Sequence, residues 1–415
     1  MDEFVELVKH AQSRGIYVIS CDGYEGGKAK AAADAGFTID VRDVDAIARL
    51  CEEQQVDGII TSFSDLMAEC MVKIADACGL ACYAKPERFR YLREKPLMKE
   101  MFAELGVPTA QTVRVRRDSI DVDIAPIGFP CVVKPANGYG SRGIYVLDSA
   151  AEVAERFDEI ASYSAFDYIL AETYMSGYEF NMMNWLVDGR AYTLGIADRE
   201  KTFEVPRAVP HVSRNAYPSR FIDEVYDEAR LIVEKVAAYV GISTGPISMQ
   251  FFWSPEEGIR VCEVAGRLFG YEHELVTIAS GFSIEKLLVD YVYDQDAMRR
   301  ELAAHDPHFP KCSAVLYFHG HERVIGDLTE ASDAVARPGV VDTVIYYNEG
   351  ETVRHGVGAM PYVLRSYIEA DTREALDELS AELYRDVRVP DVDGNDLLYA
   401  NRMVDYDGPV PGARR

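Results

Sequence analysis

The first eighty residues alternate between helical and strand-like hydrophobic spacing. Apolar side chains recur at three- and four-residue intervals over residues 2–14, which predicts a helix, and the apolar segment 16–20 reads as a strand. The same patterns predict helices at 43–55 and 65–78 and strands at 56–61 and 80–83. Because alternating helices and strands form parallel sheets covered by helices, we expect a parallel α/β domain over residues 1–92.

The beginning of the chain departs from that pattern. A domain of this kind normally opens with a strand and a glycine-rich turn, whereas residues 2–14 have helical spacing. We therefore expect either a fold that lacks its first strand or a true start upstream of Met1.

Strands dominate the region after a predicted helix at 86–105. Strand-like segments lie at 131–134, 144–148 and 168–172, one hairpin turns at Asp188-Gly189, and a second runs from 247 to 264. Residues 203–220, with three prolines, read as a loop. The last hundred residues carry strand patterns at 314–318, 343–347 and 362–369 and a helix at 372–384. The chain is therefore predicted to combine α/β and α+β regions, with a middle domain at 93–300 and a C-terminal α+β portion at 301–415.

The charge balance excludes several classes of partner. Lys and Arg total 43 against 69 Asp and Glu, so the formal net charge is −26, which disfavours binding to nucleic acid or to an anionic membrane surface. No apolar run approaches the roughly 20 residues of a membrane span, and the first residues do not resemble a signal peptide, so we expect a cytoplasmic protein. The eight cysteines form no C-x-x-C pair and are interpreted as reduced thiols.

A glycine-rich segment is the first indication of chemistry. Residues 138–143 read Gly-Tyr-Gly-Ser-Arg-Gly, which fits G-x-G-x-x-G, but strand-like residues lie on both sides, whereas a dinucleotide-binding loop opens a helix. A protein kinase would need His-Arg-Asp and Asp-Phe-Gly, and neither tripeptide occurs. Lys134 precedes the loop at the end of an apolar strand, so its ammonium can reach phosphates that the loop covers. A glycine hairpin without a ligand is the alternative.

This arrangement of lysine, strand and glycine loop resembles the ATP-grasp superfamily. Glu94-Lys95 followed by Gly106-Val-Pro108 is similar to the family's entry segment, and Ile169 to Glu179 is similar to its hinge. Ser248-Met-Gln250 and Val261-Cys-Glu263-Val-Ala-Gly-Arg267 resemble its magnesium-binding strands, in the carbamoyl-phosphate-synthase-like and biotin-carboxylase-like branch. The resemblance implies an ATP-grasp fold with an N-terminal pre-ATP-grasp domain, a lid subdomain at about 112–172 and a mixed C-terminal domain.

The resemblance also assigns roles to individual residues. Lys95 and Lys134 would bind the α and β phosphates of ATP, and Gly140, Ser141 and Arg142 lie in the lid. Glu172, Tyr174 and Met175 would meet the adenine and Glu179 the ribose. Gln250 and Glu263 would hold Mg²⁺, and Arg267 would stabilise the transferring phosphoryl group or the acyl phosphate.

The magnesium strands depart from the family's pattern at two positions. Gln250 stands where one of two acids is usual, and Ala265 stands where an asparagine is expected. Gln250 is known in carbamoyl-phosphate-synthase-like members, whereas Ala265 removes an oxygen ligand, so the second of two metals is expected to bind weakly. A surface hairpin with a solvated Glu263 is the alternative interpretation.

The family's reaction implies an ADP-forming, ATP- and Mg²⁺-dependent ligase. A small carboxylate would attack the γ-phosphate to give an acyl phosphate, which an amine would displace under a closed lid. Two other hypotheses stay open: an ATP-binding protein without ligase activity, and an NAD-binding oxidoreductase suggested only by the opening α/β pattern and by Asp22 at a strand end. Relatives in the family imply a homodimer.

Substrate contacts are predicted less directly. Arg214 and Ser219 lie in the basic and hydroxyl-rich stretch 207–220, which suits a carboxylate, although a solvated loop is equally consistent with it. Glu272-His273 invites comparison with a Glu-His pair in biotin carboxylases. Its spacing from Glu263 is one residue longer, so no catalytic base is assigned, and a helix start at Glu272 is the other interpretation.

Overall fold

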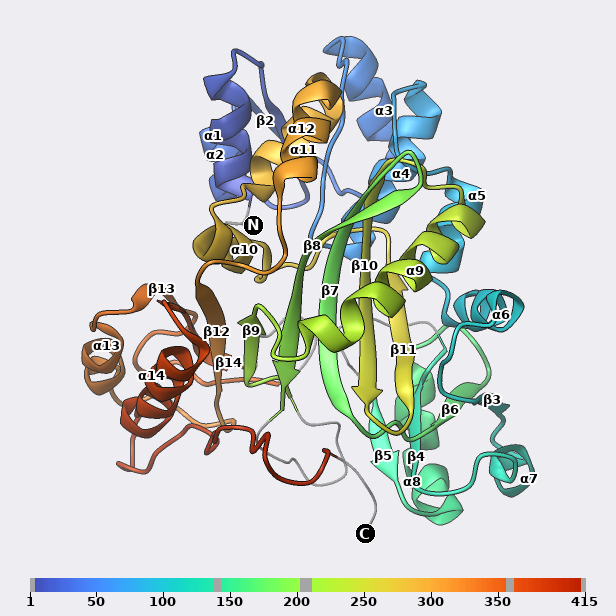
Figure 1. Cartoon of the computed structure of the whole chain (residues 1–415), viewed down its shortest axis with the longest axis vertical. Coiled ribbons are helices and arrows are strands. Elements are labelled where there is room, and N and C mark those ends of the chain that lie inside the picture. The colour runs from blue at the N-terminus through green and yellow to red at the C-terminus, as the bar shows by residue number, and fades with distance from the viewer. Residues whose placement is uncertain (1–3, 137–142, 202–210, 356–361, 412–415) are drawn as a thin grey trace.

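A computed structural model describes residues 4–136, 143–201, 211–355 and 362–411, and these form three β-sheets with helices around them (Figure 1). The large sheet has eight strands in the order β11-β10-β7-β8-β9-β12-β14-β13, and every neighbouring pair is antiparallel. A four-stranded sheet has the order β3-β6-β4-β5, and β1 and β2 form a parallel pair near the N-terminus. The mixed α/β and α+β architecture predicted from the sequence is confirmed.

The N-terminal region holds α1 (Val5–Ser13), β1 (Ile19–Asp22), α2 (Lys28–Ala32), β2 (Ala35–Thr38), α3 (Val44–Glu53) and α4 (Asp65–Cys78). The strands predicted at 56–61 and 80–83 do not form; β2 was not predicted. The segment before α4 makes its one bridge at Phe63 with Phe269, far along the chain. A β-strand needs a neighbouring strand with which it forms a continuous series of hydrogen bonds, and this segment has none. The local pattern of apolar residues could not reveal that.

A short helical stretch then leads into the small sheet. It consists of α5 (Pro86–Phe89), a 3-10 turn (Arg90–Leu92) and α6 (Lys95–Leu105). The sheet contains β3 (Thr112–Val115), β4 (Cys131–Pro135), β5 (Tyr145–Leu147) and β6 (Ile169–Thr173), with helices α7 (Ile120–Ile124) and α8 (Ala150–Ser162). β4 and β5 pair antiparallel around the glycine loop, which confirms a strand on each side of it.

The large sheet forms the middle of the molecule. It is built from β7 (Tyr178–Val187), β8 (Arg190–Glu200), β9 (Arg214–Tyr217), β10 (Gly245–Ser254), β11 (Gly258–Ala265), β12 (Cys312–His319), β13 (Val340–Ile345) and β14 (Tyr362–Ala370). The helices after β9 are α9 (Ile222–Val240), α10 (His273–Ser280), α11 (Ile284–Tyr293), α12 (Gln295–Ala304), α13 (Thr329–Val335) and α14 (Arg373–Asp386). The stretch 203–220, predicted as a loop throughout, contains β9, so that prediction is wrong for residues 214–217.

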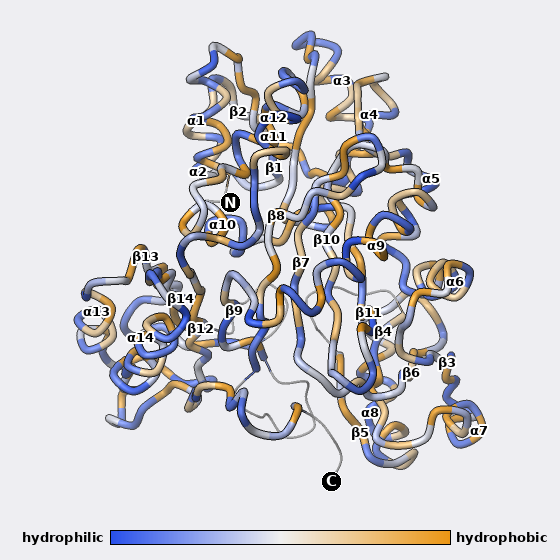
Figure 2. The backbone as a smooth tube through the Cα atoms, viewed as in Figure 1, coloured by the Kyte–Doolittle hydropathy of each residue, from blue (hydrophilic) through white to orange (hydrophobic). Residues whose placement is uncertain are grey.

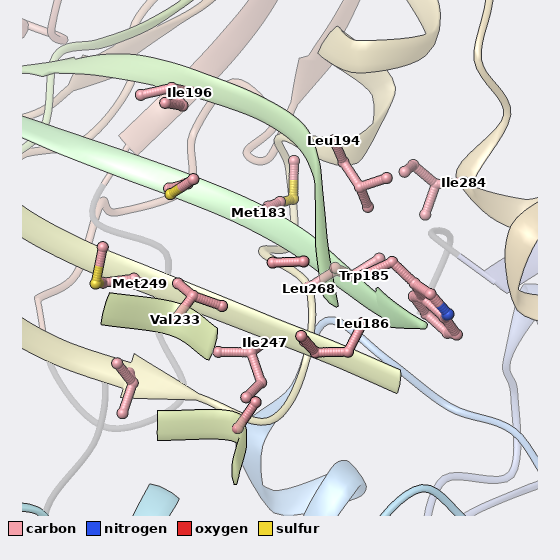
Figure 3. Close-up of a cluster of buried hydrophobic side chains, with 14 of the residues drawn as sticks. Met183, Trp185, Leu186, Leu194, Ile196, Val233, Ile247, Met249, Leu268 and Ile284 are labelled. Carbon is pink, nitrogen blue, oxygen red and sulfur yellow. The ribbon is translucent and has the colours of Figure 1, made fainter. Parts of the chain in front are cut away.

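The main hydrophobic core lies against the centre of this sheet. Side chains of β7, β8 and β10 pack with Val233 of α9 and Ile284 of α11, and Trp185 is completely buried (Figure 3). Outer helices such as α3 and α14 carry both hydrophobic and hydrophilic residues along their length, as expected for helices with one buried face (Figure 2). The rigid centre of the sheet therefore supports the residues that line the cavity beside it.

The C-terminal strands continue the large sheet. β12 pairs with β9, and β14 and β13 follow it outward. The proposed domain limits at residues 92 and 300 stay predictions. In the part of the chain that the structure describes, no helix combines the length and the apolar character needed to cross a membrane.

Candidate functional site

A cavity of about 880 Å³ lies between the small and the large sheet. Its walls come from β4, β5 and β6 on one side and from β7, β8, β10 and β11 on the other, with additional residues from α4 and α6. The structure brings together in this wall the following predicted residues: Lys95, Lys134, Glu172, Tyr174, Met175, Glu179, Gln250, Glu263 and Arg267. Residues that lie up to 172 positions apart in sequence thus share one cavity.

Two lysines and a glutamate form the positive end of the cavity. Lys95 begins α6, where Pro96 fixes the helix start, and Lys134 lies on β4. Lys134 Nζ is 2.6 Å from Glu172 Oε2, and Lys99 Nζ is 3.3 Å from Glu172 Oε1. Burial alone would raise the pKa of Glu172, but the ammonium groups of Lys134 and Lys99 outweigh it and hold that pKa at about 2. Lys134 is therefore present as a buried cation, as phosphate binding requires.

Lys95 differs from Lys134 in its surroundings. Burial lowers the pKa of the Lys95 ammonium, and the negative charge of Glu263 opposes that change. An anion such as a phosphate group beside Lys95 would add to the effect of Glu263 and favour the charged form of the lysine.

The hinge between the sheets follows β6. Tyr174 and Met175 come directly after the strand, and Gly177 has a φ of +129°. A side chain at Gly177 would bring its Cβ within 2.7 Å of the carbonyl oxygen of Trp253, so only glycine fits there. This close approach positions the chain as it enters β7, which places Glu179 in the cavity wall.

Glu179 brings two further cations into the cavity. Its carboxylate accepts hydrogen bonds from Arg199 and from Lys201, whose Nζ is 2.6 Å from Oε2, and from the amide of Gln250. Burial alone would raise the pKa of Glu179, but these two cations lower it below its usual value. Arg199 and Lys201 both line the cavity and were not predicted from the sequence.

Gln250 and Glu263 lie directly opposite each other on β10 and β11. The sequence predicted this pairing by matching Trp253 with Arg260, whereas Trp253 pairs with Ile259 and a bulge after Gln250 restores the register. In the described residues, no side chain forms a hydrogen bond or ion pair with the Glu263 carboxylate, and Gln250 uses its amide nitrogen on Glu179. A carboxylate and an amide oxygen thus remain for a ligand.

This pair fits Mg²⁺ better than a softer metal. Mg²⁺ prefers oxygen ligands and usually keeps several waters or phosphate oxygens, so it needs only one or two protein groups. The described residues include no group of three or more His, Cys, Asp or Glu side chains that could hold a metal alone. Gln250 and Glu263 would therefore hold the ion together with phosphate oxygens.

Arg267 extends from the end of β11 into an ion pair with the N-terminal region. Its Nε and Nη2 lie 3.0 and 2.9 Å from the two carboxylate oxygens of Asp65, and its guanidinium carbon is 5.1 Å from the centre of the Phe269 ring. Asp65 begins α4, which Ser64 caps. This bidentate pair fixes the direction of the guanidinium at the cavity wall.

Comparison with known proteins agrees with this geometry. Residues 94–290 match the family model of the carbamoyl-phosphate synthase L chain, ATP binding domain. This match identifies residues 94–290 as an ATP-grasp domain. Formate-dependent phosphoribosylglycinamide formyltransferase of Bacteroides thetaiotaomicron is 25% identical over 284 residues, which cover 66% of this chain and 70% of that protein.

Solved ATP-grasp structures share the fold of nearly the whole chain. The L-amino acid ligase from Bacillus licheniformis superimposes with a TM-score of 0.75 and 16% identity, covering 94% of this chain and 96% of that one. The biotin carboxylase domain of the Hydrogenobacter thermophilus 2-oxoglutarate carboxylase, solved with MgADP, ADP and bicarbonate, has a TM-score of 0.69 and 15% identity, covering 94% and 89%. At these identities the likeness establishes the fold.

Two predicted substrate residues do not line the cavity but lie behind its wall. Arg214 is fully buried and its Nη2 lies 2.7 Å from Glu200 Oε1 and 2.6 Å from Asp377 Oδ1, while Ser219 donates a 2.6 Å hydrogen bond to Asp198. The Arg214 guanidinium joins the large sheet to α14, because β9 turned this residue inward instead of leaving it on a loop. Ser219 follows β9 and is held against β8 through Asp198. Gly140, Ser141 and Arg142 lie outside the described residues.

Glu272 is a cavity residue to which sequence reasoning assigned no role. It precedes α10 as its N-cap residue, as one interpretation predicted, and its carboxylate accepts hydrogen bonds from Asn181 at 2.6 Å and Tyr217 at 2.9 Å. Burial raises the pKa of Glu272 to about 7, although both hydrogen bonds oppose the change. Its position in the wall depends on the path of the chain after Arg267, which no local pattern reveals.

Proposed function

We propose that this protein is an ATP- and Mg²⁺-dependent, ADP-forming ligase that activates a small carboxylate and couples it to an amine. The observation that carries the proposal is the convergence of Lys95, Lys134, Glu263 and Arg267 on one cavity, which Gly143 at the end of the glycine motif also lines. These are the groups that a phosphoryl transfer from ATP to a carboxylate needs: cations for the phosphates, an oxygen site for the metal and a guanidinium for the developing charge.

Each group has a distinct task in this reaction. Lys95 and Lys134 bind α- and β-phosphate oxygens, Tyr174 and Met175 face the adenine, and Glu179 holds the ribose. Gln250 and Glu263 hold Mg²⁺, which when bound neutralises phosphate charge.

The first step joins the substrate carboxylate to the γ-phosphorus. A carboxylate oxygen forms the new bond to the γ-phosphorus while the bond from that phosphorus to the bridging oxygen of ADP breaks, and ADP leaves with the electron pair. Arg267 stabilises charge on the transferring group and on the resulting acyl phosphate.

The amine then completes the ligation. Its nitrogen attacks the acyl carbon, inorganic phosphate leaves, and one proton passes from the nitrogen to a base. Exclusion of water is essential because water would otherwise hydrolyse the acyl phosphate. The cavity between the two sheets provides that enclosure on the sides that the structure describes.

The relatives support small-molecule substrates. The formyltransferase is named for formate and a phosphoribosylglycinamide, and the Bacillus licheniformis protein for L-amino acids, so a small acid and an amine are the substrates to test first. A homodimer stays part of the proposal.

The test is ADP release by the purified protein with ATP and Mg²⁺ across pools of amino acids and other small carboxylates. Lys134→Ala serves as the blank, and Lys73→Ala, at an exposed lysine on α4, serves as the matched control. ADP that forms with one pool, persists in Lys73→Ala and disappears in Lys134→Ala supports the ligase. ATP binding without ADP release from any pool would favour a nucleotide-binding protein.

A further inference from the structure

Arg365 is a buried cation that makes no ion pair in the described part of the chain. Only 6% of this residue is exposed, and its Nε and Nη1 atoms are buried without a hydrogen-bond partner. No described Asp or Glu places a carboxylate oxygen within ion-pair distance of it; the nearby Glu274 attracts its charge from farther away and accepts a hydrogen bond from Tyr367. An unpaired buried guanidinium is costly, so its presence calls for an explanation.

Tyrosine rings surround this guanidinium. Its central carbon lies 3.6 Å from the centre of the Tyr271 ring, 5.2 Å from that of Tyr367 and 5.7 Å from that of Tyr346. These contacts stabilise the positive charge over the ring faces, but they do not use the N–H donors around its edge. The cage therefore holds the arginine in place and leaves donors for a planar anion.

Arg365 lies next to the wall of the substrate cavity. It is directly opposite Tyr317 across β12 and β14, so the two side chains emerge on the same face of the sheet. Tyr317 and Tyr271 both line the cavity. Tyr271 also has a φ of +63°, a left-handed conformation that is uncommon for a residue with a large side chain. A group that enters the cavity between these rings would reach the guanidinium edge.

The position of Arg365 in the sheet separates it from the metal pair. β14 is five strands away from β10 in the sheet order, which corresponds to roughly 24 Å measured along the sheet. Tyr271, in contrast, is only four residues from Arg267 and so lies within about 14 Å of it along the chain. An anion at Arg365 would thus belong to a substrate whose reacting end lies near Arg267.

We propose that Arg365 binds a carboxylate group of a substrate that does not itself react, in a cage formed by Tyr271, Tyr346 and Tyr367. The proposal rests on the ligase function proposed above and narrows its substrates: one of them carries a spectator carboxylate, as an amino acid acting as the amine or a dicarboxylic acid does. A carboxylate is the ligand that matches a planar guanidinium edge with two parallel hydrogen bonds.

The experiment compares free acids with their primary amides. In Arg365→Met, kcat/KM for the substrate that carries the spectator carboxylate is expected to fall about 10- to 100-fold. The amide of that same substrate should be used equally by wild type and variant, and the KM for ATP should stay within about twofold. The spectator carboxylate is converted to an amide in the acid substrate and, separately, in the amine substrate. The conversion that removes the difference between wild type and variant identifies which substrate Arg365 binds. Arg385→Met, at an exposed arginine on α14, is the matched control and should behave as wild type.

Stability separates this role from a structural one. Without ligand, Arg365→Met is expected to melt at or above the wild-type temperature, because methionine removes a buried charge that makes no ion pair. A lower melting temperature together with equal losses for acid and amide would show that the cage is structural and would overturn the proposal, as would unchanged kinetics. Arg365→Lys, which keeps the charge but not the planar edge, should retain the melting temperature and lose most of the acid preference.

A failure of the ligase function would be visible on its own. If no pool gives ADP, the melting temperature is measured with the same pools as free acids and as amides in the presence of ATP. Stabilisation of wild type by the acids alone, absent in Arg365→Met, would still support the carboxylate site. Equal responses of the two proteins would refute it.

Discussion

Replacement of Glu272 by glutamine should remove a pH-dependent cost to stability. Burial raises the pKa of this carboxyl group from 4.5 to about 7. The folded state therefore binds its proton more tightly than the unfolded state does, and the stability of the wild type falls as pH rises from about 4.5 to about 7. Below that window both states are protonated and the cost vanishes. Above it both are ionised and the full cost of about 3 kcal/mol is present.

Glutamine has nearly the same shape but no charge. Its oxygen can accept the hydrogen bond from Asn181, and its amide can donate to the Tyr217 hydroxyl, so any loss in hydrogen bonding is the same at every pH. Between pH 5 and pH 8.5 the stability of Glu272→Gln relative to wild type should increase by about 2.5 kcal/mol.

Thermal unfolding at a series of pH values measures this difference. For 415 residues that unfold as one unit, an entropy of unfolding of about 2.1 cal/mol/K per residue converts 2.5 kcal/mol into a relative Tm shift of about 3 °C. Asn184→Asp, at a buried amide on β7, is a useful opposite control because it introduces a carboxyl and should lose stability as pH rises. A Tm difference between Glu272→Gln and wild type that stays constant from pH 5 to 8.5 would refute the reasoning.

Three further substitutions test the site. Lys134→Met removes a cation that binds phosphate and should lower kcat/KM for ATP at least about 100-fold, measured as ADP release. A variant that loses activity but binds ATP as tightly as wild type would argue against phosphate binding by Lys134. Glu263→Gln should raise the Mg²⁺ concentration for half-maximal ADP release about tenfold or more, and an unchanged Mg²⁺ titration would remove Glu263 from the metal site. Arg214→Met should lower the free energy of unfolding by about 3–5 kcal/mol in urea melts, because Glu200 and Asp377 lose a buried partner. Its kcat/KM at low temperature should stay within about twofold of wild type. A selective rise in the KM of one substrate would instead support the substrate role predicted for Arg214.

Local patterns predicted the strands with strong alternation and the motifs carried by a few consecutive residues. The β4–β5 hairpin and the opposition of Gln250 and Glu263 follow from turn positions and from residue types close in sequence. Lys134 was recognisable because it stands at the end of a predicted strand, and Lys95 because its segment resembles the entry segment of the ATP-grasp family.

What the sequence could not predict depends on register and on distant contacts. Counting back from the turn at Asp188-Gly189 places Glu179 opposite residue 198, whereas a bulge after Met183 shifts the ladder by one residue and brings Arg199 beside Glu179. The pair between Asp65 and Arg267 joins residues 202 positions apart, so no local pattern contains it.

The eight-stranded sheet has a consequence for how the molecule can be divided. β9, within the middle region, and β12, within the last hundred residues, are hydrogen-bonded neighbours, so a protein cut near residue 300 would expose the open edge of β9. An unprotected edge of this kind pairs readily with other chains. Residues 94–290, although they match a family model by themselves, are therefore an unsuitable expression fragment, and chimaeras with ATP-grasp proteins should exchange the sheet as a whole.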